Sequence, residues 1–592
     1  MSRFKRKIDG GKEGRESRAL VPSDKRDASF PASKQEHRRP AGAGTGRMPV
    51  PPGQPEMAGG PAGRVGGPRF PGPTVRLWAL LLLAAVIAWA SFYNLAHYPD
   101  LWWDEAIFSE TAANLAQQGR YSFTVQSPDQ LWDLDYRISA GPALILPVAL
   151  AYRLLGVGLV QGRLVAGLYL SFAFLALFLA GRRLFGPTAA LLAVALTLVG
   201  TDVLYWGRSV LGDVPALGLF IFGLWLISRG WEEDSRPSLF LGAVFLGLAF
   251  DAKEFYGLAF LPPLAVLAWR DWGRWRFLAR NLFIFILGVS LPLLGYLILK
   301  AVILGGLTPA AIHFWEQKAL LRHEFFTPLT IGRVYGENFR YLLTHPLFLA
   351  GLLGSFWLWR TGRLTLVRGL WLANFILWTL VYFTAVFWHR FALPALFLAA
   401  PPAAALICRV VRRLTSGLSP RSLQWTTTGL LAGFFFWGYP VTGLDYMKTI
   451  SQTHGQTPSR LVEYLQQHIP RSSLIETPEY ELAFLDDQHR FHLMPAFFFI
   501  KSDENGVELL NPRNSPYDFN QVKADILILG SFGKSVFSRV YPPSRVARYW
   551  RKVAQVRYYD IYVRRSPSSS AEKGRAGVNS RRALGSQPHG GL

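Results

Sequence analysis

The middle of the chain alternates long apolar segments with short polar loops that are rich in arginine. Apolar runs of about 18–25 residues are long enough to cross a bilayer as helices, which satisfy their own backbone hydrogen bonds. The pattern therefore predicts a polytopic α-helical membrane protein. Its first run, Val75–His97, starts far from the N-terminus and is too long for the core of a secretory signal, so we predict a signal-anchor helix.

One apolar segment decides the topology. Ser139–Leu155 is short and carries two prolines and an arginine, so hydropathy leaves open whether it spans the membrane. If it is re-entrant or lies at the surface, every strongly basic loop falls in the cytoplasm, as the positive-inside rule requires; if it spans, the loops from Arg182-Arg183 onward face outward. We therefore predict eleven spans, at 75–97, 161–181, 187–206, 214–229, 238–252, 256–269, 277–303, 341–359, 365–387, 391–411 and 423–444.

The same pattern divides the chain into four parts. Residues 1–74 and 566–592 are polar and lack apolar periodicity, which predicts a disordered basic segment in the cytoplasm and a disordered tail. Residues 75–444 form the predicted transmembrane catalytic domain, with an external loop at 97–160. Residues 445–565 change to the pattern of a small α/β domain, which the eleven-span topology places outside the cytoplasm.

The predicted α/β domain has recognisable helix and strand signals. Thr457-Pro458 opens a helix with its apolar residues on one face, and Thr477-Pro478 opens a short helix that carries Glu479 and Glu481. Ala524–Leu529 and Val553–Val563 run or alternate apolar, as strands do. We expect Glu479 and Glu481 to be surface charges.

Composition changes which partners are expected. The 592 residues are 50% hydrophobic, 14% aromatic and only 17% charged, which fits a membrane protein. A net charge of +24 would suggest nucleic acid in a soluble protein, but here the arginines cluster in loops, so membrane lipid is the expected partner and nucleic acid is not. Cys408 is the only cysteine, which excludes an internal disulfide and a cysteine-based metal site.

Candidate chemistry starts just past the first span, at Leu101-Trp102-Trp103-Asp104-Glu105-Ala106. Two adjacent carboxylates are costly near lipid, so we expect them to face a polar cavity. Residues 104–118 predict an amphipathic helix along the membrane surface, ending near Gly119. With eleven spans, further polar segments lie on the same external side, at 208–213, 251–256, 304–340 and 388–390. Such convergence is typical of a functional site.

Trp102-Trp103-Asp104-Glu105-Ala106, followed by Ala113-Asn114-Leu115 and Gly119-Arg120-Tyr121, resembles the first external loop of GT-C membrane glycosyltransferases. The group it resembles most is the bacterial family-39 type, related to protein O-mannosyltransferases and lipid A aminoarabinose transferases. Further motifs follow in that family's order: Gly141-Pro142, Leu146-Pro147, Gly181 to Gly186, Tyr205-Trp206-Gly207-Arg208, Asp213-Val214-Pro215, Lys253 and His389-Arg390. The resemblance covers residues 75–565.

The resemblance implies a sugar donor linked to polyprenyl or dolichyl phosphate. The sugar would pass to a hydroxyl of a protein, lipid or envelope glycan, on the outer face of the plasma or inner membrane. By match to the family motif, Asp104 is the predicted general base, a role that suits a carboxylate within reach of the acceptor hydroxyl. Glu105 would support it or bind substrate. Alternatively, both acids only stabilise the start of a helix.

Other residues are candidates for binding. Asp213 would orient Asp104 or the sugar, or share a divalent cation with it, although it could simply cap a helix; we assign no metal ligands. The developing charge on the leaving phosphate requires cations or hydrogen-bond donors. The candidates are Lys253, His389 and Arg390, then Arg137 or Arg208; for any one lysine or arginine, the alternative is snorkelling to the interface.

The loop 304–340 and the overall class of protein each allow two interpretations. His313, Glu316, His323 and Glu324 lie in one loop but lack a tight metal-ligand pattern, so we expect a solvated or substrate-covering loop. A transporter or a non-catalytic envelope assembly protein is the alternative to a transferase. A transporter usually places its charges near the midplane between repeated halves, and this sequence shows neither feature.

Overall fold

The computed structural model describes residues 73–126, 130–134, 138–325, 331–384, 388–414, 448–451, 457–493, 499–503, 506–510, 517–535, 537, 538 and 540–565. Several predictions lie outside these residues: almost all of the N-terminal segment 1–74, the tail 566–592, the last predicted span 423–444 and the candidate phosphate ligand Arg137.

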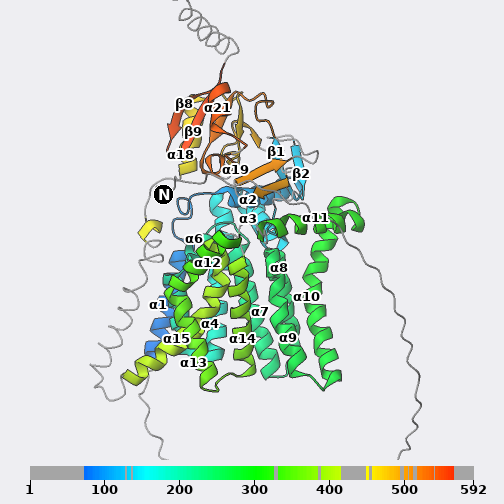
Figure 1. Cartoon of the computed structure of the whole chain (residues 1–592), viewed down its shortest axis with the longest axis vertical. Coiled ribbons are helices and arrows are strands. Elements are labelled where there is room, and N and C mark those ends of the chain that lie inside the picture. The colour runs from blue at the N-terminus through cyan, green and yellow to red at the C-terminus, as the bar shows by residue number, and fades with distance from the viewer. Residues whose placement is uncertain are drawn as a thin grey trace, which may run out of the picture. The chain divides into compact units, whose positions relative to one another are not determined.

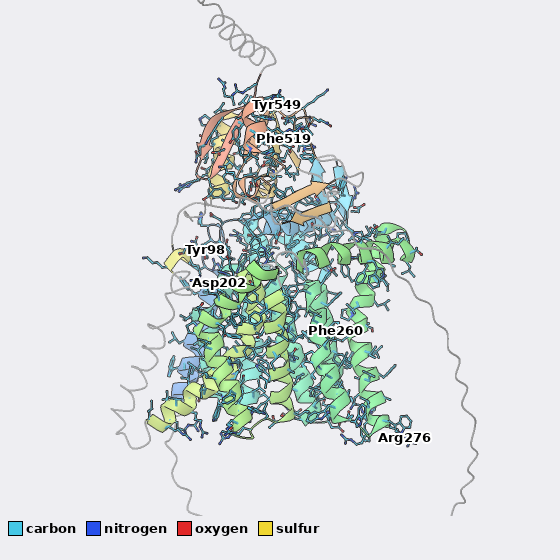
Figure 2. All side chains as sticks on the ribbon, in the orientation of Figure 1. Tyr98, Asp202, Phe260, Arg276, Phe519 and Tyr549 are labelled. Carbon is cyan, nitrogen blue, oxygen red and sulfur yellow. The ribbon has the colours of Figure 1, made fainter. Side chains whose placement is uncertain are left out.

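Helices make up most of the described chain (Figure 1), and Figure 2 adds their side chains. In chain order they are α1 Pro73–Phe92, α2 Trp103–Gln118, α3 Pro142–Leu155, α4 Leu159–Phe185, α5 Pro187–Gly200, α6 Val203–Gly207, α7 Asp213–Glu232, α8 Arg236–Ala252, η1 Glu254–Phe260, α9 Leu261–Arg270, α10 Trp275–Leu304, α11 Leu307–Phe325, α12 Ile331–Thr344, α13 Pro346–Arg360, α14 Leu366–Thr384, η3 His389–Ala392 and α15 Leu393–Leu414.

Several of these helices are suited to a membrane. Among the described residues, five are long and apolar enough to cross one: α4, α7, α10, α14 and η3 with α15. A sixth is possible if α12 and α13, bent by 75° at their junction, count as one broken span. The chain is thus a multi-pass membrane protein. The apolar parts of α1, α3 and α5 are shorter, so the number eleven stays a prediction.

Some predicted spans are not single α-helices, and the one at 341–359 contains the bend between α12 and α13. The segment predicted at 187–206 forms α5 and α6, with a break at Thr201 and Asp202 between them. The segment predicted at 256–269 forms most of η1 and then α9. Residues at such breaks leave backbone groups without helical partners, which is tolerated where they are covered by protein or line a polar region.

Helix α2 confirms the predicted helix at 104–118 and its end. Acidic residues in its first turn suit the positive end of the helix dipole. Gly119, with φ +69°, adopts the left-handed conformation that ends the helix, and its N–H meets the carbonyls of Asn114 and Leu115. The expected one-sided amphipathic pattern is wrong, because α3 packs on one side and the later helix α19 on another, burying polar and apolar residues alike.

A seven-stranded mixed sheet lies next to α2, and two of its strands come from the first loop. Its order is β2-β1-β4-β3-β7-β9-β8, with β3 parallel to β4 and β7 and the other pairs antiparallel. The bounds are β1 Ser122–Gln126, β2 Gln130–Asp133, β3 Leu474–Thr477, β4 Arg490–Leu493, β7 Ile526–Leu529, β8 Trp550–Val556 and β9 Tyr559–Arg564. A separate hairpin pairs β5 Phe499–Asp503 with β6 Gly506–Leu510.

Four helices accompany the sheet: α18 Thr457–His468, α19 Tyr480–Leu485, α20 Ser531–Lys534 and α21 Pro543–Tyr549. The helix predicted from Thr457 and the strand predicted at Ala524–Leu529 are confirmed. The strand predicted at Val553–Val563 is two strands, β8 and β9. The chain reverses between them at Arg557, whose φ is +56°, so the apolar run spans a hairpin.

Glycines let three helix ends meet closely. A Cβ on Gly141, just before α3, would lie 1.9 Å from the carbonyl oxygen of Asp251 near the end of α8. A Cβ on Gly212, just before α7, would lie 2.3 Å from the carbonyl oxygen of Ala252. Because no real Cβ makes such contacts, only glycine permits this approach. The starts of α3 and α7 and the end of α8 therefore share one end of the helical part.

Candidate active site

Alternating helix directions bring the candidate site residues together. The structure joins the start of α2 to the start of α4 through Glu105 and Arg163, and to the chain before α7 through the backbone N–H of Val210. The start of α2 also contacts η3, which precedes α15, through Asp104 and Arg390. Polar residues far apart in the sequence thus lie at the same end of these helices.

Asp104, the predicted general base, forms an ion pair with Arg390. The distance from its Oδ2 to Nη1 of Arg390 is 2.8 Å, and its side chain is 16% exposed, so it is not fully closed off from solvent. In a partly water-excluded setting, this pairing holds the carboxylate in place better than a surface ion pair would. The structure thus unites two residues that the sequence resemblance had assigned to different roles.

Arg390 lies among aromatic rings. Its guanidinium carbon is 5.2 Å from the ring centre of Trp102, 5.6 Å from that of Trp206, 5.4 Å from that of Trp388 and 5.2 Å from that of Phe391. Cation–π contacts strengthen when the cation is desolvated, as it is here. The aromatic setting keeps a planar cation beside Asp104, where it can also face an anionic group.

Glu105 is held differently from its neighbour. Arg163 donates two parallel hydrogen bonds to it, from Nε to Oε1 at 2.7 Å and from Nη2 to Oε2 at 2.8 Å, and both side chains are fully buried. The N–H of Val210 adds a third bond at 3.1 Å. With its oxygens occupied, Glu105 supports the start of α2. Arg163 itself was not singled out from the sequence; a lone arginine inside a predicted span was the available signal.

Arg208 contacts backbone carbonyls. It donates to Ala90, Tyr93 and Tyr98, all in or just after α1, and its side chain is fully buried. Such an arginine fixes the path of the chain from α1 towards α2. Its N–H groups donate to backbone carbonyls, so the structure shows this candidate phosphate ligand stabilising the chain at the end of α1.

Asp213 begins α7, and its side chain is only 3% exposed. Within the described part of the chain, neither of its carboxylate oxygens has a hydrogen-bond partner. Buried carboxylates are normally satisfied, so such an oxygen pair requires an explanation at a candidate site. The simple helix cap that was the alternative for Asp213 is not formed, because Gly212 occupies the cap position and the Asp213 carboxylate accepts no bond from the described residues.

Lys253 and His389 complete the candidate cations. Lys253, 5% exposed, donates from Nζ to the hydroxyl of Ser139 at 2.9 Å and lies 5.8 Å from the ring centre of Phe108 in α2. His389 lies 3.0 Å from Asp202 through its Nδ1 and stacks on Tyr341 at 4.3 Å, with 40% of its side chain exposed. Asp202, at the break between α5 and α6, was missed from the sequence because an acid inside a predicted span looks like a misplaced boundary.

The structure describes only some of the candidate ligands in the loop 304–340. His313 lies 2.6 Å from the carbonyl oxygen of Leu134 through its Nε2, which ties α11 to the first loop. Among the residues that the structure describes, no three histidine, cysteine or acidic side chains group closely enough to hold a metal. A shared divalent cation therefore stays a prediction, and the side chains of His323 and Glu324 lie outside the described residues.

The expectation of surface charge at Glu479 and Glu481 is wrong, because both are buried. Glu479 accepts bonds from the N–H groups of Gly530 and Gly533 at 2.8 Å each, and the hydroxyl of Tyr559 donates to Glu481 at 2.8 Å. Burial raises the pKa of both carboxyls, and for Glu481 the adjacent Glu479 raises it further.

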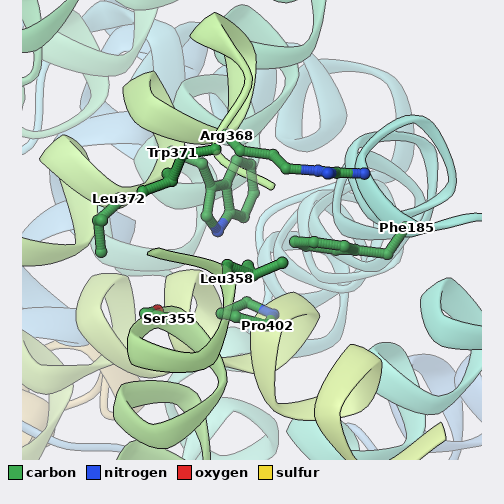
Figure 3. A pocket seen from close by; sticks show the side chains of 8 residues that line it. Phe185, Ser355, Leu358, Arg368, Trp371, Leu372 and Pro402 are labelled. Atoms are coloured by element: carbon green, nitrogen blue, oxygen red, sulfur yellow. The ribbon is translucent and has the colours of Figure 1, made fainter. Parts of the chain in front are cut away.

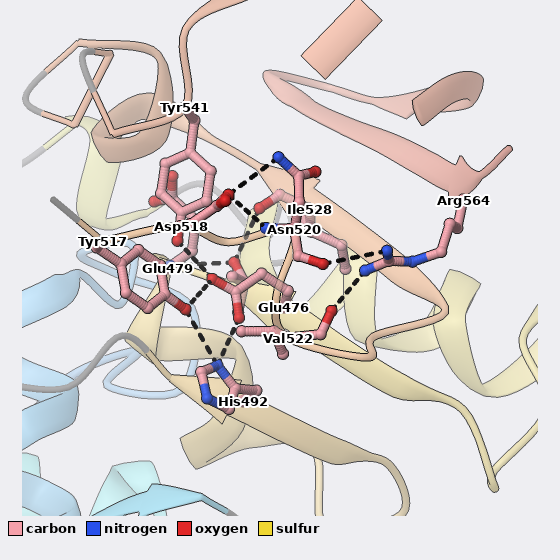
Figure 4. Close-up of polar contacts among 11 residues, drawn as sticks. Glu476, Glu479, His492, Tyr517, Asp518, Asn520, Val522, Ile528, Tyr541 and Arg564 are labelled. Carbon is pink, nitrogen blue, oxygen red and sulfur yellow. Dashed lines mark hydrogen bonds and ion pairs between the residues drawn. The ribbon is translucent and has the colours of Figure 1, made fainter. Parts of the chain in front are cut away.

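A third buried acid lies nearby, in strand β3 of the sheet (Figure 4). Glu476 in β3 accepts hydrogen bonds from Tyr517 at 2.8 Å and Tyr541 at 2.7 Å, and pairs with Nδ1 of His492 at 2.5 Å. Burial, followed by the charge of Glu476, raises the pKa of Tyr541 well above its ordinary value. This network stabilises the junction of β3 and β4.

The pocket in Figure 3 lies elsewhere. Its lining includes Phe185 at the end of α4, together with Arg368 and Trp371 of α14. Arg163 lies near the start of α4, 22 residues before Phe185, which is about 33 Å at 1.5 Å per residue. This small pocket is therefore not the place where Asp104 and its partners meet.

Residues 140–298 match the family model described as dolichyl-phosphate-mannose-protein mannosyltransferase. No curated protein matches the chain in sequence. Among solved structures, the chain is similar to ArnT from Cupriavidus metallidurans bound to undecaprenyl phosphate. The identity is 16% and the TM-score 0.55, with 84% of this chain and 99% of that chain covered. AglB, the oligosaccharyltransferase of Archaeoglobus fulgidus, in complex with an inhibitory peptide and a dolichol-phosphate, has 11% identity and a TM-score of 0.52, with 83% and 74% covered.

The matched segment 140–298 contains Arg163, Arg208, Asp213 and Lys253, all of which lie at the end of the helices described above. The two similar structures extend the likeness in fold over most of the chain. By the family match over residues 140–298 and by its fold, the chain is similar to membrane glycosyltransferases of the GT-C type, among them the protein mannosyltransferases and ArnT.

Proposed function

We propose that the chain transfers a sugar from a polyprenyl- or dolichyl-phosphate-linked donor to a hydroxyl acceptor, with Asp104 as general base. The observation that carries the proposal is the Asp104–Arg390 ion pair, which places a partly exposed carboxylate beside a cation in aromatic surroundings. Asp104 takes the proton of the acceptor hydroxyl, and the acceptor oxygen attacks the anomeric carbon. The bond from that carbon to the phosphate oxygen breaks, and the lipid phosphate leaves.

The leaving phosphate needs positive charge or hydrogen-bond donors, and three candidate side chains lie at this end of the helices. Arg390 lies next to the base, Lys253 is tied to Ser139 beside α2, and His389 is held by Asp202 with its ring partly exposed. The support from similar proteins is that ArnT was solved with undecaprenyl phosphate and AglB with a dolichol-phosphate. We assign Asp213 to orienting Asp104 or the sugar, because its carboxylate is buried without a partner among the described residues.

We infer that this end of the helices faces outward from the plasma or inner membrane, with the eleven-span topology and a cytoplasmic N-terminus. The support is the distribution of arginines. Arg360, Arg363 and Arg368 lie between or at the ends of α13 and α14, and Arg368 donates to the carbonyl of Leu184 near the end of α4. Because α4 separates Leu184 from Arg163, the basic loops lie opposite the candidate site. The external α/β domain at 445–565 belongs to this proposal.

The test uses the purified full-length protein with radiolabelled polyprenyl-phosphate sugars and envelope membranes as the acceptor source. Asp104→Asn should lower turnover by about 10²–10⁴-fold, the range typical of losing a general base. Asp133→Asn, at an exposed ion pair with Arg120, is the matched control and should keep turnover.

Unchanged turnover in Asp104→Asn, in a protein with the wild-type unfolding midpoint, would contradict the assigned base. The alternatives make a different prediction. A transporter or an assembly protein would form no labelled product even as wild type, although it could still bind the lipid-linked sugar.

A further inference from the structure

Trp103, the residue before the candidate base, packs against residues that follow strands β3 and β7 of the sheet. Trp103 donates from its indole N–H to the carbonyl of Pro478 at 2.9 Å. Its ring stacks on Tyr480 with 4.9 Å between ring centres, and on Phe532 with 5.4 Å. Stacked aromatic pairs stabilise beyond the area that they bury, so Trp103 is firmly held. The residue next to Asp104 is thus fixed by parts of the chain more than 370 positions later.

The other tryptophan of the motif connects the same region to Arg390. Trp102 lies 5.7 Å from Phe532 between ring centres and 5.2 Å from Trp388. Arg390 lies over the ring of Trp102 at 5.2 Å and pairs with Asp104 at 2.8 Å. Phe532 therefore contacts both tryptophans that precede the candidate base, and one of them contacts the cation that holds it.

A buried carboxylate fixes Phe532. Glu479 accepts from the N–H groups of Gly530 and Gly533 at 2.8 Å and of Phe532 at 3.4 Å. The segment cannot shift easily, because a Cβ on Gly530 would lie 2.6 Å from the ring of Tyr559 and 2.8 Å from Glu479 itself. Glu479 follows Pro478, whose carbonyl holds Trp103, so one turn of chain anchors both partners of this aromatic contact.

We propose that Glu479 and Phe532 are positioning residues for glycosyl transfer: they hold Trp102 and Trp103 so that Asp104 and Arg390 keep their mutual geometry. The inference rests on the proposed function and deepens it, because it assigns the region after residue 457 a part in the chemical step. Neither residue contacts the candidate cations Lys253 and His389 in the described contacts, so donor binding should depend on them less than turnover does.

The test measures kcat and donor KM on the full-length protein with the same labelled donors. Phe532→Ala should lower kcat by about 10–100-fold, as expected when a reacting group is misplaced by a fraction of an ångström to one ångström, while donor KM changes less than about threefold. Phe532→Tyr, which keeps the ring, should recover most of kcat. Glu479→Ala should behave like Phe532→Ala, whereas Glu479→Gln retains an oxygen that accepts the two glycine N–H groups and should be milder.

Loss of stability alone is controlled by Phe519→Leu. Phe519 is fully buried in the apolar cluster against which Trp103 and Phe532 also pack, but its own ring contact is with Tyr541, at 5.0 Å between ring centres. It should lower the unfolding midpoint at least as much as Phe532→Ala while leaving kcat near wild type. Equal losses of kcat in the two variants, or wild-type kcat in Phe532→Ala, would overturn the inference. Asp104→Asn is assayed in parallel. If Asp104→Asn loses turnover while Phe532→Ala keeps it, only this inference is wrong. If Asp104→Asn keeps turnover, the proposed function is wrong.

Discussion

At the scale of single residues, burial divides the acidic side chains into two groups. Asp104 and Glu105 are neighbours, yet Glu105 is fully buried in a double hydrogen bond with Arg163, while Asp104 is partly exposed beside Arg390. A carboxylate whose oxygens are all occupied supports structure, and one that substrate can reach can accept a proton. Asp104, which is partly exposed to water, is therefore the candidate general base, and the more tightly paired Glu105 is not.

The buried carboxyl of Glu481 should make the stability of the protein depend on pH. Burial and the neighbouring Glu479 raise its pKa, so the folded protein keeps a proton that the unfolded chain releases above about pH 4.3. The contribution of Glu481 to stability is therefore greatest below that pH and is lost as pH rises towards the folded pKa. Glu481→Gln should flatten the fall of the unfolding midpoint between about pH 4.5 and 8.

The measurement is thermal unfolding of the full-length protein in detergent across that pH range. Glu463→Gln, at an exposed position of α18, is the control and should keep the wild-type slope. Parallel pH profiles of wild type and Glu481→Gln would contradict the assignment of a buried, protonated carboxyl.

At the scale of elements, α2 is positioned by long-range ties and only its limits are local. Acidic residues in the first turn and Gly119 after the last one are visible in the sequence, and both limits were predicted within a residue. The partner of Glu105 lies 58 positions away in α4, and the donors to Glu479 lie more than 50 positions away. Hydrophobic periodicity carries no information about such pairings, so Arg163 and the burial of Glu479 could not be predicted from it.

The tie between α2 and α4 gives an element-scale prediction. Arg163→Ala leaves the Glu105 carboxylate buried without its cation, which should cost about 3–5 kcal/mol of unfolding free energy. Replacing both partners by apolar residues, Glu105→Leu with Arg163→Met, should recover much of the loss. Unfolding midpoints in detergent measure both effects.

Arg120→Ala is the comparison variant, because Arg120 pairs with Asp133 at the surface, with 45% of its side chain exposed. Its unfolding midpoint should stay at the wild-type value. A similar drop for Arg120→Ala and Arg163→Ala would show that the buried pair has no special part in holding α2.

At the scale of the whole molecule, two distant regions build one sheet, and the helical part presents two chemically different ends. The sequence predicted a polytopic helical protein and strands after residue 524, because both depend on local apolar patterns. It did not predict that β1 and β2 of the first loop would join the strands beyond residue 474, because strand pairing depends on shape and not on spacing. The broken segment of α5 and α6 was likewise concealed by continuous hydropathy.

The proposed orientation can be tested with single cysteines after Cys408→Ala. Arg363→Cys, exposed between α13 and α14, should react with a membrane-impermeant maleimide only after cells are opened. Lys552→Cys on β8, 44% exposed, should react on intact cells. Labelling of the Arg363→Cys variant from outside, or of both variants equally, would overturn the eleven-span topology.

The pairing of β1 with β4 has a consequence for synthesis. Gln126 meets His492, so a ribosome must add 366 residues after the first loop before its sheet partner emerges. At about 5–20 residues per second, that delay is roughly 20–70 s. Throughout it, β1 presents an unpaired edge, the kind of surface on which aggregation and chaperone capture begin. A premature stop codon between β1 and β4 would therefore yield a fragment whose β1 edge never finds this partner.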